Sequence, residues 1–280
     1  MSTLLTRHDP REAKRYYDDG LWCDDNFYSL VAGHAGKQPD AFALRDSRRR
    51  LTWREIQTWA DAVAQDLHEA GLRRGDRVAI WLTNRVEAVI VFLACARNGY
   101  ICNPSLHQSY TNEEILKLLT DLSAAAVFTE TDSEFALAIQ NLPAMRRVCR
   151  LPQGREPGTD FPSLSEPGDG QFPPDDNADR VCYLAFTSGT TGTPKGVMHS
   201  HNTLLANPRD MVRDWNHDKR TVLLSLSPLS HHIAWVAVGQ ILICGGELVV
   251  NDPPEEMKQL DWIVETGATY VMGVPTHAMD

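Results

Sequence analysis

Segments of strand length alternate with segments of helical length along most of this chain. Thr52 and Glu55 have the capping-box spacing that opens a helix, and an apolar segment at 77–82 has the length of a strand. Residues 86–97 predict a helix that is apolar on most sides, and 100–102 predict a second strand. This alternation indicates βαβ units. The predicted fold class is therefore α/β, with mainly parallel sheets and helices packed on their faces.

The same alternation continues toward the end of the sequence. Thr111 with Glu114, and Thr131 with Glu134, repeat the capping-box spacing ahead of apolar runs, and a strand is predicted between the two pairs at 124–128. Further downstream, the pattern predicts strands at 222–226, 247–250 and 269–273 and helices at 233–243 and 254–265, the last of these opened by prolines.

A long connection divides the sequence. Residues 152–177 are rich in Pro, Gly, Asp and Ser and lack periodicity, which is typical of a surface linker. We therefore expect a first α/β subdomain with an N-terminal extension at 1–151 and a second α/β subdomain at 178–280. The last residues look like the beginning of another helix, so we expect the second subdomain to be truncated at its C-terminal end.

Charge and cysteine content limit the class of partner. The 280 residues carry a formal net charge of −10, which argues against a general nucleic-acid binder and favours small molecules. The six cysteines are widely spaced and form no CxxC pair, as expected for unpaired thiols in a reducing compartment. The N-terminus lacks the apolar core of a secretory signal, and polar residues and a glycine pair interrupt the longest apolar stretch, at 233–250. We predict a cytoplasmic protein without a transmembrane segment.

The segment YLAFTSGTTGTPKGVMH at 183–199 has the composition of a phosphate-binding loop between two apolar stretches. Its glycines let main-chain N–H groups approach a ligand, its hydroxyls add donors, and Lys195 supplies a positive charge. The Walker pattern is excluded, because Pro194 precedes the lysine and Gly196 follows it. The segment thus predicts a phosphate site that is not a P-loop.

This segment resembles the phosphate-binding signature of the adenylate-forming superfamily, which contains acyl-CoA synthetases, adenylation domains and beetle luciferases. The resemblance extends over nearly the whole chain, in the order of the family's N-terminal domain. Four further segments carry it: 38–53, 75–84, 92–104 and 269–276. The sequence therefore resembles an N-terminal domain fragment of such an enzyme.

The resemblance implies a flexible loop that closes on the β- and γ-phosphates of ATP. Its residues in this sequence are Thr187, Ser188, Gly189, Thr190, Thr191, Gly192 and Lys195. A multiply charged anion needs several convergent N–H and O–H donors and a cation, which these residues supply.

Two further segments resemble the family's acyl pocket. His231 fits the position of a gate beside the pocket, whereas Ser230 departs from the family's frequent aromatic residue. The alternative is that His231 and His232 cap a helix N-terminus. Neither these two histidines nor the pair His199 and His201 has a Cys or carboxylate at ligand spacing, which disfavours zinc.

The second pocket segment consists of Gly273, Val274 and Pro275. The family places this edge near the acyl-adenylate, and the alternative is a plain helix start with Pro275 at the first position. The segment is therefore expected to bind substrate or only to begin a helix.

The function that the resemblance implies is ATP-dependent activation of a carboxylic acid to an acyl-adenylate, followed by transfer to coenzyme A. Apolar residues around the pocket segments favour a hydrophobic acid, medium-chain, alicyclic or aromatic. The family's Mg2+ carboxylate, ribose-binding aspartate, hinge and catalytic lysine have no counterpart in this sequence. We therefore expect no catalytic residue within it, an inactive fragment, and self-association through uncovered apolar surface. The alternatives are an adenylation domain that loads a carrier protein and a non-catalytic nucleotide-binding module.

Overall fold

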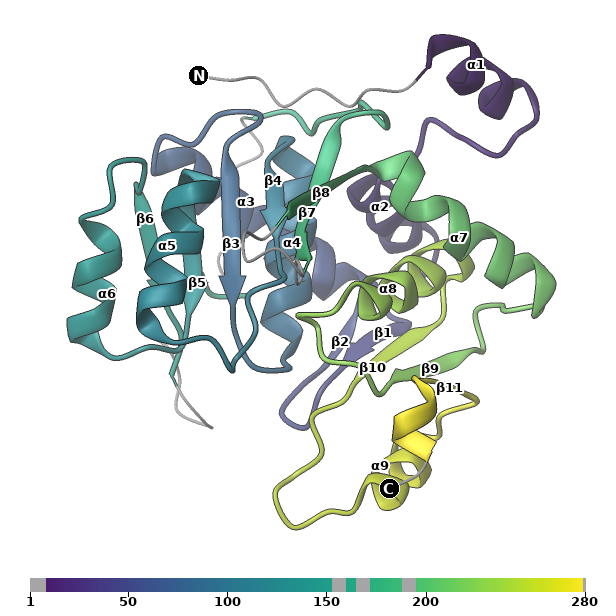
Figure 1. Cartoon of the computed structure of the whole chain (residues 1–280). Coiled ribbons are helices and arrows are strands. Elements are labelled where there is room, and N and C mark those ends of the chain that lie inside the picture. The colour runs from purple at the N-terminus through teal and green to yellow at the C-terminus, as the bar shows by residue number, and fades with distance from the viewer. Residues whose placement is uncertain (1–8, 153–159, 165–171, 188–194, 279–280) are drawn as a thin grey trace.

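The computed structural model describes residues 9–152, 160–164, 172–187 and 195–278 of the chain. In these residues the chain forms two sheets with helices between and outside them (Figure 1). The predicted α/β class is confirmed, since both sheets are mainly parallel.

The six-stranded sheet contains the first three predicted strands. Five neighbouring strands run parallel and the edge strand is antiparallel to its neighbour. In order across the sheet, the strands are β6 (Arg147–Arg150), β5 (Ala124–Thr129), β3 (Arg77–Trp81), β4 (Ile101–Asn103), β7 (Val181–Thr187) and β8 (Lys195–Ser200).

The five-stranded sheet combines strands from distant parts of the chain. Four neighbouring strands run parallel. The strand at one edge is antiparallel to its neighbour, with which it forms a hairpin. In order, the strands are β11 (Tyr270–Met272), β9 (Val222–Ser225), β10 (Glu247–Val250), β1 (Phe42–Arg45) and β2 (Arg50–Thr52).

Each sheet takes strands from both sides of the connection at 152–177. The β1–β2 hairpin lies N-terminal to it and pairs with β10, whereas β7 and β8 lie C-terminal to it and extend the sheet of β3 and β4. The ranges 1–151 and 178–280 therefore do not each contain one complete sheet. That residues 152–177 form a surface linker stays a prediction. It does not determine which sheet each strand joins.

The helices form three layers around the two sheets (Figure 1). Those between the sheets include α2 (Phe27–Lys37), α3 (Trp53–Glu69), α4 (Val86–Asn98) and α8 (His232–Cys244), with α7 (His201–Asp214) packed on α8. The outer face of the six-stranded sheet is covered by α5 (Asn112–Leu122) and α6 (Ser133–Gln140), and that of the other sheet by α9 (Gln259–Thr266). The N-terminal helix α1 spans Pro10–Asp18, and the 3-10 helix η1 spans Pro275–Ala278.

Apolar side chains dictate this layering. Every residue of α4 is buried, as the prediction of an interior helix required. Burial of a Leu, Ile or Phe side chain contributes roughly 1.5–3 kcal/mol, so a helix apolar on all sides is stable only where other elements surround it. None of the helices in the described part of the chain is long and apolar enough to cross a membrane.

Two predicted helix starts are wrong. Thr131 does not cap α6, because the Asp132 carboxylate accepts the N–H of Phe135 at 2.8 Å and the helix begins at Ser133. The helix predicted from Pro254 begins only at Gln259. Residues 254–257 instead form a turn closed by a hydrogen bond from the Met257 N–H to the Pro254 carbonyl.

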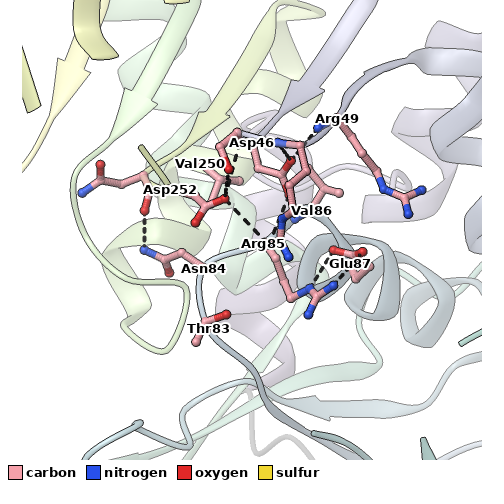
Figure 2. A network of polar contacts seen from close by, with 12 residues as sticks. Asp46, Arg49, Thr83, Asn84, Arg85, Val86, Glu87, Val250 and Asp252 are labelled. Atoms are coloured by element: carbon pink, nitrogen blue, oxygen red, sulfur yellow. Dashed lines mark hydrogen bonds and ion pairs between the residues drawn. The ribbon is translucent and has the colours of Figure 1, made fainter. Parts of the chain in front are cut away.

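A buried ion network fixes the turn between β3 and α4 (Figure 2). The Arg85 guanidinium donates to both oxygens of Glu87 at 2.9 and 3.1 Å and to Glu130 at 2.6 Å, and the three side chains are at most 6% exposed. The Val86 N–H donates to Asp46, which belongs to the β1–β2 hairpin. The network thereby joins the C-terminal edge of the six-stranded sheet to the five-stranded one.

Candidate functional site

The phosphate loop begins and ends on one antiparallel pair. Thr187, the last residue of β7, pairs with Lys195, the first residue of β8. The predicted binding residues Ser188, Gly189, Thr190, Thr191 and Gly192 lie outside the described residues. The register nevertheless holds the two ends of the loop side by side, which the sequence did not predict.

The base of this loop is attached to the segment after β4. The Phe186 N–H donates to Ser105 Oγ at 2.9 Å, and the Ser105 hydroxyl donates to Asn103 Oδ1 at 3.3 Å. On the other strand, residues 195–198 of β8 are exposed. Lys195 is thus an exposed residue at the start of the edge strand of the sheet.

Histidines from two segments meet at the N-terminus of α8. His231 occupies the N-cap position, but its side chain makes no capping hydrogen bond, so the structure does not support the side-chain capping alternative for it. Its ring centroid lies 4.7 Å from that of His107, and His107 Nδ1 is joined to Ser230 Oγ by a hydrogen bond of 3.1 Å. Burial, and secondly the neighbouring His231, lower the pKa of His107. The lowered pKa favours the neutral imidazole, in which one ring nitrogen donates and the other accepts a hydrogen bond.

The next histidine of α8 contacts the strand that leaves the phosphate loop. The rings of His232 and His199 stack with centroids 5.1 Å apart, and both lie against Tyr183 of β7. Burial lowers the pKa of both imidazoles, and in His199 the neighbouring His232 lowers it further. The β7–β8 hairpin and the start of α8 are thus in contact through these three rings.

The third predicted segment lies at the end of β11. Gly273, Val274 and Pro275 are exposed, and Pro275 opens η1 as its first residue. A Cβ atom on Gly273 would lie 3.2 Å from Leu226 Cδ1 and 3.0 Å from His277 Nδ1. The segment is therefore adjacent to the beginning of the loop that carries His231.

Sequence reasoning missed His107. It follows the short strand β4 and contacts Ser230, which lies 123 positions further along the chain. No local pattern marks such a contact. Within the described ranges, no group of three or more His, Cys, Asp or Glu side chains could hold a metal ion.

The two mainly parallel sheets and the β7–β8 pair have the architecture of the N-terminal domain of adenylate-forming enzymes. The chain belongs to the AMP-binding enzyme family, which it matches over residues 31–280.

Among relatives, it is 30% identical to 2-hydroxy-7-methoxy-5-methyl-1-naphthoate–CoA ligase of Streptomyces carzinostaticus, over 86% of this chain and 47% of that protein. It is 25% identical to enterobactin synthase component E of Escherichia coli, over 91% of this chain and 48% of the relative. The chain therefore spans about half the length of these relatives.

Known structures agree with this assignment. ATP-bound MatB from Rhodopseudomonas palustris superposes with a TM-score of 0.75 at 29% identity, covering 90% of this chain and 50% of MatB. The apo structure of MbtA from Mycobacterium smegmatis gives a TM-score of 0.81 at 23% identity, covering 95% of this chain and 51% of that one. The second comparison supports the fold alone.

Proposed function

We propose that this chain is the ATP- and acid-binding part of an acid–thiol ligase. In this proposal ATP activates a carboxylic acid to an acyl-adenylate with release of pyrophosphate, and the acyl group then passes to coenzyme A. The observation that carries the proposal is the pairing of Thr187 with Lys195 in a member of this family. The pairing flanks a segment of glycines and hydroxyls in the sequence, and the strand that leaves this segment contacts the N-terminus of α8 through His199 and His232.

Each segment has a proposed role. Thr187, Lys195 and the residues between them contact the phosphates of ATP, because their N–H, O–H and ammonium donors suit a multiply charged anion. Mg2+ is proposed to arrive with ATP, since Mg2+ is commonly held by substrate phosphates and only one or two carboxylates. His231 borders the acid, with Gly273, Val274 and Pro275 along the same pocket.

The acid is proposed to be hydrophobic, either medium-chain, alicyclic or aromatic. Relatives at comparable identity include the naphthoate–CoA ligase and, at 29% identity over 82% of this chain and 42% of the relative, a medium-chain fatty-acid–CoA ligase of Escherichia coli. A cytoplasmic location accords with the cysteines, all six of which are free.

A second candidate is an adenylation domain that loads a carrier protein. Enterobactin synthase component F of Escherichia coli O157:H7 favours it, being 28% identical over 89% of this chain and 18% of that protein. The two candidates differ in the thiol acceptor and not in the activation step.

Pyrophosphate exchange tests the proposal. The full-length protein that contains this chain is incubated with ATP, Mg2+, labelled pyrophosphate and a panel of fatty, alicyclic and aromatic acids. Acid-dependent exchange followed by formation of an acyl-CoA supports the ligase. Exchange with acyl transfer only to a carrier protein supports the second candidate. ATP binding without exchange for any acid would refute both in favour of a non-catalytic nucleotide-binding module.

A further inference from the structure

The side chain of Asn84 bridges three segments at the C-terminal edges of the two sheets. Its Oδ1 accepts the N–H of Leu229 at 2.9 Å, and its Nδ2 donates to the carbonyl of Asn251 at 2.9 Å. Leu229 lies in the loop between β9 and α8, and Asn251 directly follows β10. One amide group thus joins the turn after β3 to two connections of the other sheet.

The residues on both sides of Asn84 are anchored by hydrogen bonds, and Figure 2 shows Thr83, Asn84 and Arg85 along this turn. The preceding residue, Thr83, donates its N–H and its hydroxyl to Glu130, each at 2.9 Å. The following residue, Arg85, is held by the same carboxylate and by Glu87. Because its neighbours are anchored in the buried ion network, the amide of Asn84 is presented with little freedom of its own.

The Leu226–His231 loop depends on a small number of such contacts. The N–H of Leu226 donates to the Met272 carbonyl at 2.8 Å, and its carbonyl accepts from Asn251 Nδ2 at 3.2 Å. At the other end, the Leu229 carbonyl accepts from Trp235 Nε1 at 2.8 Å. Asn84 therefore supports the loop twice, directly at Leu229 and indirectly by holding Asn251.

We infer that Asn84 is a positioning residue that fixes the Leu226–His231 loop, and with it the His231 side chain, against the six-stranded sheet. The functional consequence of this inference rests on the proposed function, because the loop borders the proposed acid site. His231 follows Leu229 by two residues, and its N–H donates to the Pro228 carbonyl at 2.9 Å. A shift of Leu229 is thus transmitted to His231 through the backbone.

Two variants separate the two hydrogen bonds of Asn84. Asn84→Ala removes both, whereas Asn84→Asp keeps an acceptor for the Leu229 N–H and replaces the donor to the Asn251 carbonyl with a carboxylate oxygen, which repels it. The matched control is Thr83→Ala, which removes the hydroxyl bond to Glu130 but keeps the N–H bond to the same carboxylate, so the turn stays anchored and both bonds of Asn84 remain. All are made in the full-length protein that contains this chain.

Two measurements are made on each variant. Hydrogen exchange of the peptide covering 226–231 should be about tenfold faster in Asn84→Ala, less affected in Asn84→Asp, and unchanged in Thr83→Ala. In pyrophosphate exchange, Asn84→Ala should raise the KM for the acid about tenfold and leave the KM for ATP within about twofold. A merely structural role would lower the amount of active protein without this difference between the two substrates.

The outcomes distinguish the inference from the proposed function. Unchanged exchange at 226–231 in both folded Asn84 variants would overturn the positioning role. Faster exchange with an unchanged KM for the acid would support the hydrogen-bonding role and refute the proposed role of His231. If Asn84→Ala does not fold, Asn84→Asp decides, and an equal rise of both KM values in that variant would overturn the inference.

Discussion

Replacement of Arg85 by Met should destabilise the protein strongly at neutral pH. The guanidinium donates hydrogen bonds to two buried carboxylates, Glu87 and Glu130, and to the Pro152 carbonyl at 3.1 Å. Met fills a similar volume, so the main loss is electrostatic. Removal of one partner from a buried ion pair costs about 3–5 kcal/mol, because the remaining charge stays desolvated. Arg85→Met leaves two such charges, and we expect the upper part of this range at about pH 7.5.

The pH dependence of this loss follows from the pKa of Glu87. Burial would raise that pKa, but the hydrogen bond and charge of Arg85 outweigh burial and hold the pKa below its ordinary value. In the wild type, Glu87 therefore contributes stability that is present above the unfolded-state pKa and is lost as the pH falls through the folded-state pKa. Without Arg85, burial raises the pKa, and the carboxyl can protonate instead of remaining charged. The cost of Arg85→Met should therefore shrink toward about pH 4.5.

Urea unfolding at the two pH values measures this cost. Arg85→Met/Glu87→Gln/Glu130→Gln should recover at least about half of it at neutral pH, because no buried charge remains unpaired. The control is Lys14→Met, which breaks a pair whose side chains are 74% and 59% exposed and should change stability by less than about 1 kcal/mol. A cost below about 1 kcal/mol for Arg85→Met, or one that grows at acid pH, would refute the reasoning.

Three other predictions concern single sites. Lys195→Ala should slow pyrophosphate exchange at subsaturating ATP roughly ten- to a hundredfold without changing the melting temperature, and unchanged exchange would contradict its phosphate role. Burial, and secondly Arg180, lower the pKa of His201 to about 3, so His201 contributes stability that is lost as the pH falls from about 6.5 toward 3. Between about pH 6 and 4, the unfolding free energy of His201→Asn should fall less steeply with decreasing pH than that of the wild type, by up to about 1.4 kcal/mol per pH unit. Urea unfolding at several pH values measures this slope, and an unchanged slope would contradict the prediction. Leu260 and Val264 on α9 are 74% and 79% exposed, so Leu260→Lys/Val264→Lys should lower the mass of any self-associated species in sedimentation, and unchanged association would exclude this face.

The elements that the sequence predicted best are those with a local physical signal. Thr52 with Glu55, and Thr111 with Glu114, form reciprocal capping boxes at the start of α3 and α5. The third such pair failed because Asp132, one residue later, supplies a carboxylate that caps the helix. Sequence spacing alone does not decide between two adjacent capping side chains.

Sheet membership had no comparable signal. The pairing of Leu44 with Leu248 in β1 and β10 joins residues that are about two hundred positions apart. Both strands are short, with Ala43 and Leu44 of β1 and all four residues of β10 buried, and short apolar segments fit many parallel neighbours of similar hydrophobicity. For the same reason the sequence divided the chain at its long connection, whereas the structure draws both sheets from both sides of it.

The position of the candidate site follows from the fact that each sheet contains strands from both sides of the connection at 152–177. Since β7 and β8 join the six-stranded sheet, the phosphate loop begins at an edge formed largely by the first half of the chain. The loop that carries His231 instead follows β9 of the other sheet. The first turn of α8 then contacts β8, because His232 stacks on His199. In parallel α/β sheets, ligands bind beyond the carboxyl ends of the strands, and here these ends come from two sheets. We therefore expect the proposed phosphate and acid positions to depend on contacts between the sheets, such as those of Asn84. Substitutions at this junction should affect the acid and phosphate positions unequally, because Asn84 bonds the loop of one sheet whereas the β7–β8 pairing belongs to the other.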